Sequence, residues 1–226
     1  ALKPLEMPIH YVVGNHDVYG WMLKGQEIMQ EPVYGKKLYQ DAVVHGPTYR
    51  SWDQAGMHFV IMDSIQPGKA GGWFGRIDDD QLTWLKNDLE KTSGPTIAFV
   101  HVPLMTIFNQ YAVATTSPLT NGLVVENGKQ VFDILSKHSV KAVFQGHTHV
   151  PGIFTENLQF LSPEEIDYAH QLDGRKTLCN VGSVGQPRDG DWRACYVLLD
   201  GETIRYRRVE YDIDTTIKKI YAIPDL

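Results

Sequence analysis

The sequence predicts an α/β fold in a single domain that spans residues 1–226. Three observations predict it. Apolar runs alternate with amphipathic helical segments in the first 150 residues, as in sheets with helical crossovers. Short strand-like runs dominate after Pro151. The hydrophobic content of 42% and the charged content of 21% are ordinary for a globular protein. We find no internal repeat and no convincing linker, and we therefore expect one domain.

The first half of the chain supplies four candidate strands. Residues 9–13 (IHYVV) form a continuous apolar run, which predicts a strand covered on both faces. Residues 48–64 read as a hairpin with its turn at residues 53–56. Residues 96–100 and 141–145 are two further apolar runs, so we expect them to be buried strands as well.

Two amphipathic helices are predicted between these strands. The first covers residues 78–92, with acidic residues in its first turn and Leu82, Leu85 and Leu89 on one face. The second covers residues 128–139. The stretch from residue 105 to residue 126 is an apolar loop, and we expect it to form a lid or rim over a site.

The segment after Pro151 predicts a β-rich ending. Its strands are expected at residues 176–182, 193–200 and 203–211, and a short helix at residues 214–222 should end before Pro224. Cys179 and Cys195 lie in two of these apolar runs. We expect them to be buried, reduced thiols, which fits a cytoplasmic protein.

The charge of the chain restricts its partners. A net charge of −6 argues against binding a nucleic-acid polymer or an anionic membrane surface, because both need a basic face. No apolar run approaches the length that crosses a bilayer. A small phosphorylated substrate stays compatible with the acidic chain if metal ions supply positive charge locally.

Three polar clusters directly follow predicted strands. They are Asn15-His16-Asp17, His101, and the pair His147 and His149. Loops at the carboxyl ends of such strands converge on one edge of a sheet, so these side chains are expected to meet. A single histidine after a strand is more often a structural residue, but the combination favours a metal site.

The motif GHTH (residues 146–149) suits two metal ions. In an extended segment its two imidazoles would lie on one side, about 6–7 Å apart by the strand rise. Each could then serve one of two ions that lie about 3.5–4 Å apart. Imidazole nitrogens together with an amide oxygen indicate a mixed site for manganese, iron or zinc.

His16 and Asp17 suit proton transfer. A histidine oriented by a carboxylate can protonate a leaving alkoxide. Asp17 reads equally well as a turn or N-cap carboxylate.

The segments GNHD, HVP and GHTH, in this order, resemble three motifs of the calcineurin-like metallophosphoesterases. That superfamily includes purple acid phosphatases and cyclic-nucleotide phosphodiesterases, and the resemblance covers nearly the whole chain. It implies a four-layer αββα sandwich with a two-metal site at the strand ends. By the family pattern, Asn15, His101 and His147 bind one ion and His149 binds the other. His16 would be the catalytic imidazole, paired with Asp17.

The resemblance also implies a reaction. It is the hydrolysis of a phosphomonoester, or of a small phosphodiester such as a cyclic nucleotide, by a hydroxide that bridges two metal ions. Arg188, on a turn-rich loop, is expected to clamp the phosphate with two hydrogen bonds. The alternative is a surface arginine paired with Asp189 or Asp191.

Two family motifs, Asp-any-His and Gly-Asp, do not precede GNHD. We therefore expect the fold to lack its first one or two βα units. Asp63 ends a predicted strand, but we expect it to be structural rather than a substitute ligand. Open sheet edges would favour pairing with another chain, for example as a homodimer. The alternative hypothesis for function is a catalytically silent binding or scaffold module with an incomplete metal site.

Overall fold

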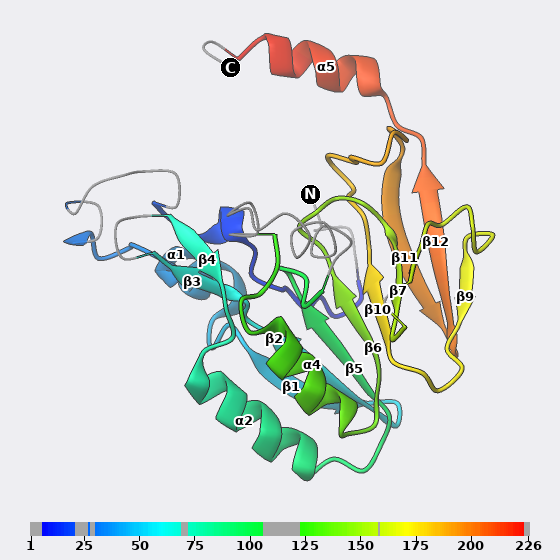
Figure 1. Cartoon of the computed structure of the whole chain (residues 1–226). Coiled ribbons are helices and arrows are strands. Elements are labelled where there is room, and N and C mark those ends of the chain that lie inside the picture. The colour runs from blue at the N-terminus through cyan, green and yellow to red at the C-terminus, as the bar shows by residue number, and fades with distance from the viewer. Residues whose placement is uncertain are drawn as a thin grey trace, which may run out of the picture.

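The computed structural model of the chain is a sandwich of a large and a small β-sheet, with helices on the outer face of the large sheet (Figure 1). The α/β class predicted from the sequence is therefore confirmed. The structure describes residues 6–20, 27, 30–68, 72–105, 123–157 and 159–223. In the described part of the chain, no helix is long and apolar enough to cross a membrane.

The large sheet has seven strands in the order β1-β2-β5-β6-β10-β7-β8. The central pairs β2-β5, β5-β6 and β6-β10 are parallel, whereas the outer pairs are antiparallel. The parallel centre matters for function, because it brings the carboxyl ends of β5 and β6 to the same edge. The strands are β1 (Arg50–Gln54), β2 (Met57–Met62), β5 (Thr96–Val100), β6 (Val140–Gln145), β7 (Gly152–Thr155), β8 (Phe160–Leu161) and β10 (Thr177–Asn180).

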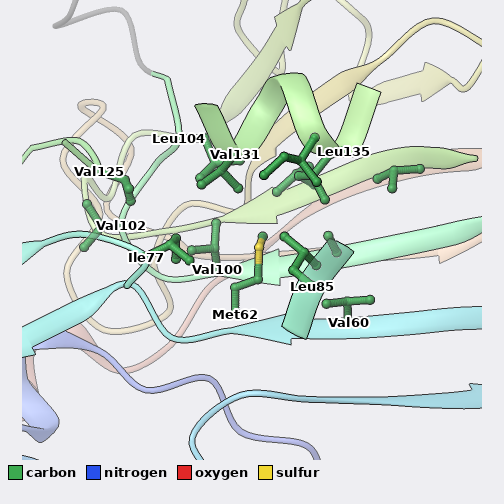
Figure 2. Packing of buried hydrophobic residues seen from close by; sticks show 14 of the residues in the cluster. Val60, Met62, Ile77, Leu85, Val100, Val102, Leu104, Val125, Val131 and Leu135 are labelled. Atoms are coloured by element: carbon green, nitrogen blue, oxygen red, sulfur yellow. The ribbon is translucent and has the colours of Figure 1, made fainter. Parts of the chain in front are cut away.

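Helices α2 (Asp79–Glu90) and α4 (Gly128–Ser136) cover one face of this sheet. Figure 2 shows Leu85 from α2 and Val131 from α4 packed over Val60 and Val100 of the strands. The predicted first helix begins where expected, because the Asp78 side chain accepts a hydrogen bond from the backbone of Gln81 at 2.8 Å.

The opposite face of the large sheet packs on a three-stranded sheet of order β11-β12-β9. Ile97 and Phe144 of the large sheet share this second core with Ile204 and Tyr206 of β12. The small sheet consists of β9 (Ala169–Gln171), β11 (Ala194–Asp200) and β12 (Thr203–Val209). Cys179 and Cys195 are buried and free, which confirms the predicted thiols.

The remaining elements are short or lie at the periphery. Helix α5 (Ile213–Tyr221) follows β12 after a short connection and extends beyond the end of the small sheet (Figure 1). The others are the 3-10 helix η1 (Asn15–Asp17), α1 (Lys37–Tyr39), the π-helix η3 (Gln40–Val44), and the hairpin of β3 (Ile65–Pro67) and β4 (Trp73–Gly75).

The predicted helical layer over the small sheet is absent from the described residues. Tyr196 and Leu198 on β11 are instead 40% and 45% exposed. The physical reason is the connection at residues 210–212, after which α5 leaves the sheet rather than turning back over it (Figure 1).

The strand predicted at residues 9–13 is wrong. The segment has no strand pairing, and only Val13 within it is buried. An apolar run becomes a strand only when neighbouring strands complete its hydrogen bonds, and in the described residues this segment has none.

By contrast, the hairpin of β1 and β2 is confirmed. Ala55 and Gly56 both have positive φ in its two-residue turn. Most of the loop predicted as a lid, residues 106–122, lies outside the described residues.

Candidate metal centre

Two neighbouring parallel strands deliver the first histidines of the site. His101 directly follows β5, and Gly146 and His147 directly follow β6. The backbone N–H of Gly146 donates to the carbonyl oxygen of His101 at 3.0 Å, so the two loops leave the sheet together. The sequence-based expectation that these loops converge is met for His101 and His147.

Asn15, His101 and His147 present their polar atoms to one point. Asn15 Oδ1 lies 2.9 Å from His101 Nε2 and 3.1 Å from His147 Nδ1, and the two ring nitrogens are 3.3 Å apart. Ligands about 2.1 Å from one ion lie roughly 3.0 Å apart in octahedral and 3.4 Å apart in tetrahedral geometry. The three atoms therefore have the spacing of ligands that share one cation.

Gly14 allows this close approach. The Cβ that any other residue would carry here would lie 3.1 Å from Cε1 of His101. Its N–H donates to Asp17 Oδ2 at 2.8 Å, which closes the short turn of η1. Asp17 thus acts as a turn carboxylate, one of its two predicted roles, and its pairing with His16 stays a prediction.

The GHTH loop is not extended as predicted. His147 and His149 have φ angles of 68° and 62°, in the left-handed region that few non-glycine residues occupy. Such strain persists only where surrounding contacts hold the backbone, and it is typical of functional sites. Asn180 supplies two of these contacts, because its Nδ2 donates to the Gly146 carbonyl at 2.9 Å and to Thr148 Oγ1 at 2.8 Å.

His149 is oriented from a different direction. Its Nδ1 lies 2.8 Å from the carbonyl oxygen of Gln186. A carbonyl only accepts, so Nδ1 carries the proton and Nε2 keeps its lone pair. This is the arrangement in which a histidine ligates a metal through one nitrogen and is held through the other.

The pKa shifts of His101 and His149 follow from burial and from neighbouring charges. Burial, the largest cause, together with the nearby His147, His149 and His16 lowers the pKa of His101 to about 3. Burial also lowers the pKa of His149, against the opposing effect of the Gln186 carbonyl, and Arg188 and His16 add to the decrease. Both imidazoles are therefore neutral at neutral pH, which is the form that ligates metal.

Arg188 lies near this cluster, since its charge affects His149. It is exposed, and its Nη2 donates to Oε1 of Gln186 at 2.8 Å. The alternative pairing with Asp189 or Asp191 is wrong, because these carboxylates pair with Arg208 and Arg193. The Arg188 guanidinium thus forms no ion pair with either of the two predicted carboxylates.

Asp63 is structural, as predicted. The residue is only 1% exposed. Its carboxylate accepts hydrogen bonds from Lys36, from Thr48 and from the backbone N–H of Ile65. In the described ranges, no group of three His, Cys, Asp or Glu residues has metal-binding geometry. The candidate centre therefore depends on the amide oxygen of Asn15. Two nitrogens and one oxygen fit manganese, iron or zinc.

Sequence reasoning missed several supporting residues. Trp73 of β4 stands edge-on to His147, with ring centroids 5.3 Å apart. Gln145 is buried at the end of β6 and binds the backbone of Leu104 and Met105. A polar residue at the end of an apolar run was the available signal for Gln145 and for Asn180.

Comparison with known proteins shows the family of the chain. The family profile described as calcineurin-like phosphoesterase matches residues 1–151. A probable cyclic nucleotide phosphodiesterase of Synechococcus sp. is 26% identical over 210 residues, which are 91% of this chain and 70% of that protein. A probable cyclic nucleotide phosphodiesterase of Fibrobacter succinogenes is 28% identical over 150 residues, which are 66% and 48% of the two chains.

Two further similarities are more limited. An uncharacterised protein of Methanocaldococcus jannaschii is 40% identical over 80 residues, or 34% of this chain and 32% of that protein. The crystal structure of a metallophosphoesterase from Sphaerobacter thermophilus aligns with a TM-score of 0.38 and 22% identity, over 64% of this chain and 57% of the other. The matched regions thus span from a third to 70% of the length of these relatives. The match over residues 1–151, which contains every motif of the centre, shows that the chain belongs to the calcineurin-like phosphoesterase family, whose members hydrolyse phosphoester bonds with divalent metal ions.

Proposed function

We propose that this chain hydrolyses a small phosphodiester, such as a cyclic nucleotide, at a centre that holds two divalent metal ions. The observation that carries the proposal is the convergence of Asn15 Oδ1, His101 Nε2 and His147 Nδ1 within 2.9–3.3 Å of one another. The names of the Synechococcus and Fibrobacter relatives support the substrate class.

The three convergent atoms would hold one ion, and Nε2 of His149 would ligate the second. Bound metal ions of this kind lower the pKa of water and neutralise charge on a phosphoryl group. Manganese, iron and zinc all suit the nitrogen and oxygen donors.

The surrounding residues would act on the substrate itself. His16 is exposed and lies within electrostatic reach of His101 and His149, so it can present a proton to the leaving oxygen. Arg188 is exposed beside His149, and its planar guanidinium can bind two phosphate oxygens. Trp73 would shield one side of His147 from water through its edge-on ring contact.

Turnover of bis(4-nitrophenyl) phosphate with added Mn²⁺ tests the proposal. We expect the His147→Ala and Asn15→Ala variants to lose activity by about 100-fold or more, since even outer-shell partners of metal ligands contribute 10–100-fold. His138→Ala is the matched control, because His138 precedes β6 at the end of the strand far from the site. Activity that survives both ligand substitutions would contradict the proposal.

The alternatives predict different results in the same assay. A cyclic nucleotide should be hydrolysed faster than 4-nitrophenyl phosphate if the substrate is a diester, and the order should reverse for a phosphomonoesterase. A binding or scaffold module would bind metal and ligand without turnover of either ester.

A further inference from the structure

Arg208 is a buried charge that the proposed reaction does not use. It lies on β12, and its side chain is only 3% exposed. Its Nη2 donates to Oδ2 of Asp189, and its Nε, which is buried without a hydrogen-bond partner among the described residues, lies 3.5 Å from Oδ2 of Asp191 in an ion pair. Its Nη1 donates to the carbonyl oxygen of Arg193 at 3.4 Å. One guanidinium therefore binds one loop at three points.

This loop, residues 183–193, also holds His149. The Gln186 carbonyl accepts the Nδ1 proton of His149, and the backbone N–H of Arg188 donates to the His149 carbonyl at 3.1 Å. Gln186 is itself fixed, because its N–H donates to Ser183 Oγ at 2.9 Å. The loop therefore contacts both the ring and the backbone of His149.

This loop is also fixed at its ends, because the N–H of Cys195 donates to the carbonyl oxygen of Ser183 at 2.9 Å and Arg193 pairs with Asp191 at 2.7 Å. It contains no helix or strand, and it includes Gly185, Pro187 and Gly190. Asp189 and Asp191 lie two residues apart, with side chains only 15% and 21% exposed, so their charges repel unless a cation lies between them. Arg193 pairs with Asp191, whereas the planar guanidinium of Arg208 contacts both carboxylates and so links them, which a single ammonium group does less well.

We propose that Arg208 is a positioning residue for His149. By binding Asp189 and Asp191 it holds the 183–193 loop in the one conformation that places the Gln186 carbonyl against Nδ1, which leaves the Nε2 lone pair of His149 for a ligand. The proposal rests on the proposed function only for the identity of that ligand as a metal ion. The tautomer of His149 is a property of the protein alone.

The first test therefore uses metal-free protein. Two-bond ¹H–¹⁵N correlation spectra at one fixed pH report which nitrogen of His149 carries the proton. We expect the Nδ1–H tautomer in the original chain and a large shift towards Nε2–H in Arg208→Met. Arg208→Lys should give an intermediate mixture, because a lysine pairs with one of the two carboxylates.

Arg205→Met is the matched control. Arg205 lies on the same strand and pairs with Asp200, at 3.5 Å, away from the loop. This variant removes the same charge from β12 and should keep the Nδ1–H tautomer. If Arg208→Met does not fold, the double variant Arg208→Met, Asp189→Asn removes the uncompensated acid and should show the same change of tautomer.

The second test adds metal. We expect the apparent affinity for Mn²⁺ to fall about tenfold in Arg208→Met, which is the lower end of the effect of residues that support metal ligands. The affinity should stay unchanged in Arg205→Met. A changed tautomer with unchanged Mn²⁺ affinity would support the positioning role and contradict the role of His149 as a metal ligand. An unchanged tautomer in Arg208→Met, folded as judged by its spectrum, would overturn the proposal.

Discussion

Gly14 and His101 show how closely the candidate centre is packed at the level of single residues. A methyl group at position 14 would lie 3.1 to 3.3 Å from three atoms of the His101 imidazole, which is anchored at the end of a buried strand. The ring would have to move by a few tenths of an ångström to accept it. A shift of this size matters because metal ligands require precise geometry.

We therefore expect Gly14→Ala to weaken Mn²⁺ binding by about tenfold, an effect typical of disturbed support for a ligand. Isothermal titration of the metal-free protein measures it. Gly94→Ala is the matched control, because in the described part of the chain an added Cβ there meets only the carbonyl oxygen of Gly56, at 3.5 Å, and Gly94 precedes β5 at the end opposite His101. Equal metal affinities in the two variants would show that the contact with His101 is not important.

The residues of the centre differ in how far the sequence predicts them. Asn15, His101 and His147 were predictable because each follows or lies near an apolar run, and parallel strands bring their ends together. The Gln186 carbonyl was not predictable, since a backbone acceptor leaves no mark on residue type. The left-handed φ angles of His147 and His149 could not be predicted from the sequence either, because only tertiary contacts such as those of Asn180 stabilise them.

His58 connects three secondary-structure elements. It lies on β2, and its Nδ1 and Nε2 donate to Asp53 of β1 at 2.7 Å and to Asp88 of α2 at 2.9 Å. Burial alone lowers the pKa of His58, but the hydrogen bonds to Asp53 and Asp88 outweigh it, and the pKa is raised above 6.5. Both ring nitrogens face carboxylates, so the folded chain favours the imidazolium form.

This ion cluster predicts a pH-dependent stability. Because the pKa is higher in the folded than in the unfolded chain, the stabilisation is fully present below about pH 6.5 and is lost as the pH rises through the folded pKa. We expect the free energy of unfolding to fall over this range, because the folded chain releases the proton that stabilises the cluster. Urea unfolding at a series of pH values measures it.

The double variant Asp53→Asn, Asp88→Asn serves as the control for His58. It keeps the imidazole but removes both carboxylates, so only burial acts on the pKa. The contribution of His58 should then change sign and increase as the pH rises towards 6.5. The same downward trend in both proteins would assign the pH dependence to other groups.

At the level of elements, local signals decided which predictions succeeded. The helix at residues 79–90 was predictable because Asp78 caps it and three leucines share one face. The failed strand at residues 9–13 has an equally apolar sequence, but strand formation depends on partners that a local pattern does not report. The arrangement of the small sheet depends on long-range packing, and the sequence alone indicated only its strands.

At the scale of the whole molecule, the candidate centre joins segments that are distant in the chain. Asn15 is 86 residues from His101 and 132 residues from His147. A cation bound between them would link η1 to the ends of β5 and β6. Ligands that bind only the folded state stabilise it, by about 2.7 kcal/mol at a concentration 100 times the dissociation constant.

We therefore expect Mn²⁺ to raise the melting temperature of the chain and a chelator to reverse the increase. Differential scanning calorimetry with and without the metal measures the change. The His147→Ala variant should show little of it, whereas His138→Ala should respond like the original chain. An equal response in both variants would place the stabilising metal elsewhere.

The most direct test is crystallographic. Crystals grown with Mn²⁺ and measured near the manganese absorption edge locate the ion by its anomalous scattering. The arrangement of Asn15, His101 and His147 predicts a peak about 2.0–2.3 Å from Oδ1, Nε2 and Nδ1 of these residues, respectively. Strong manganese peaks elsewhere with none between these three atoms would contradict the claim that they share a cation.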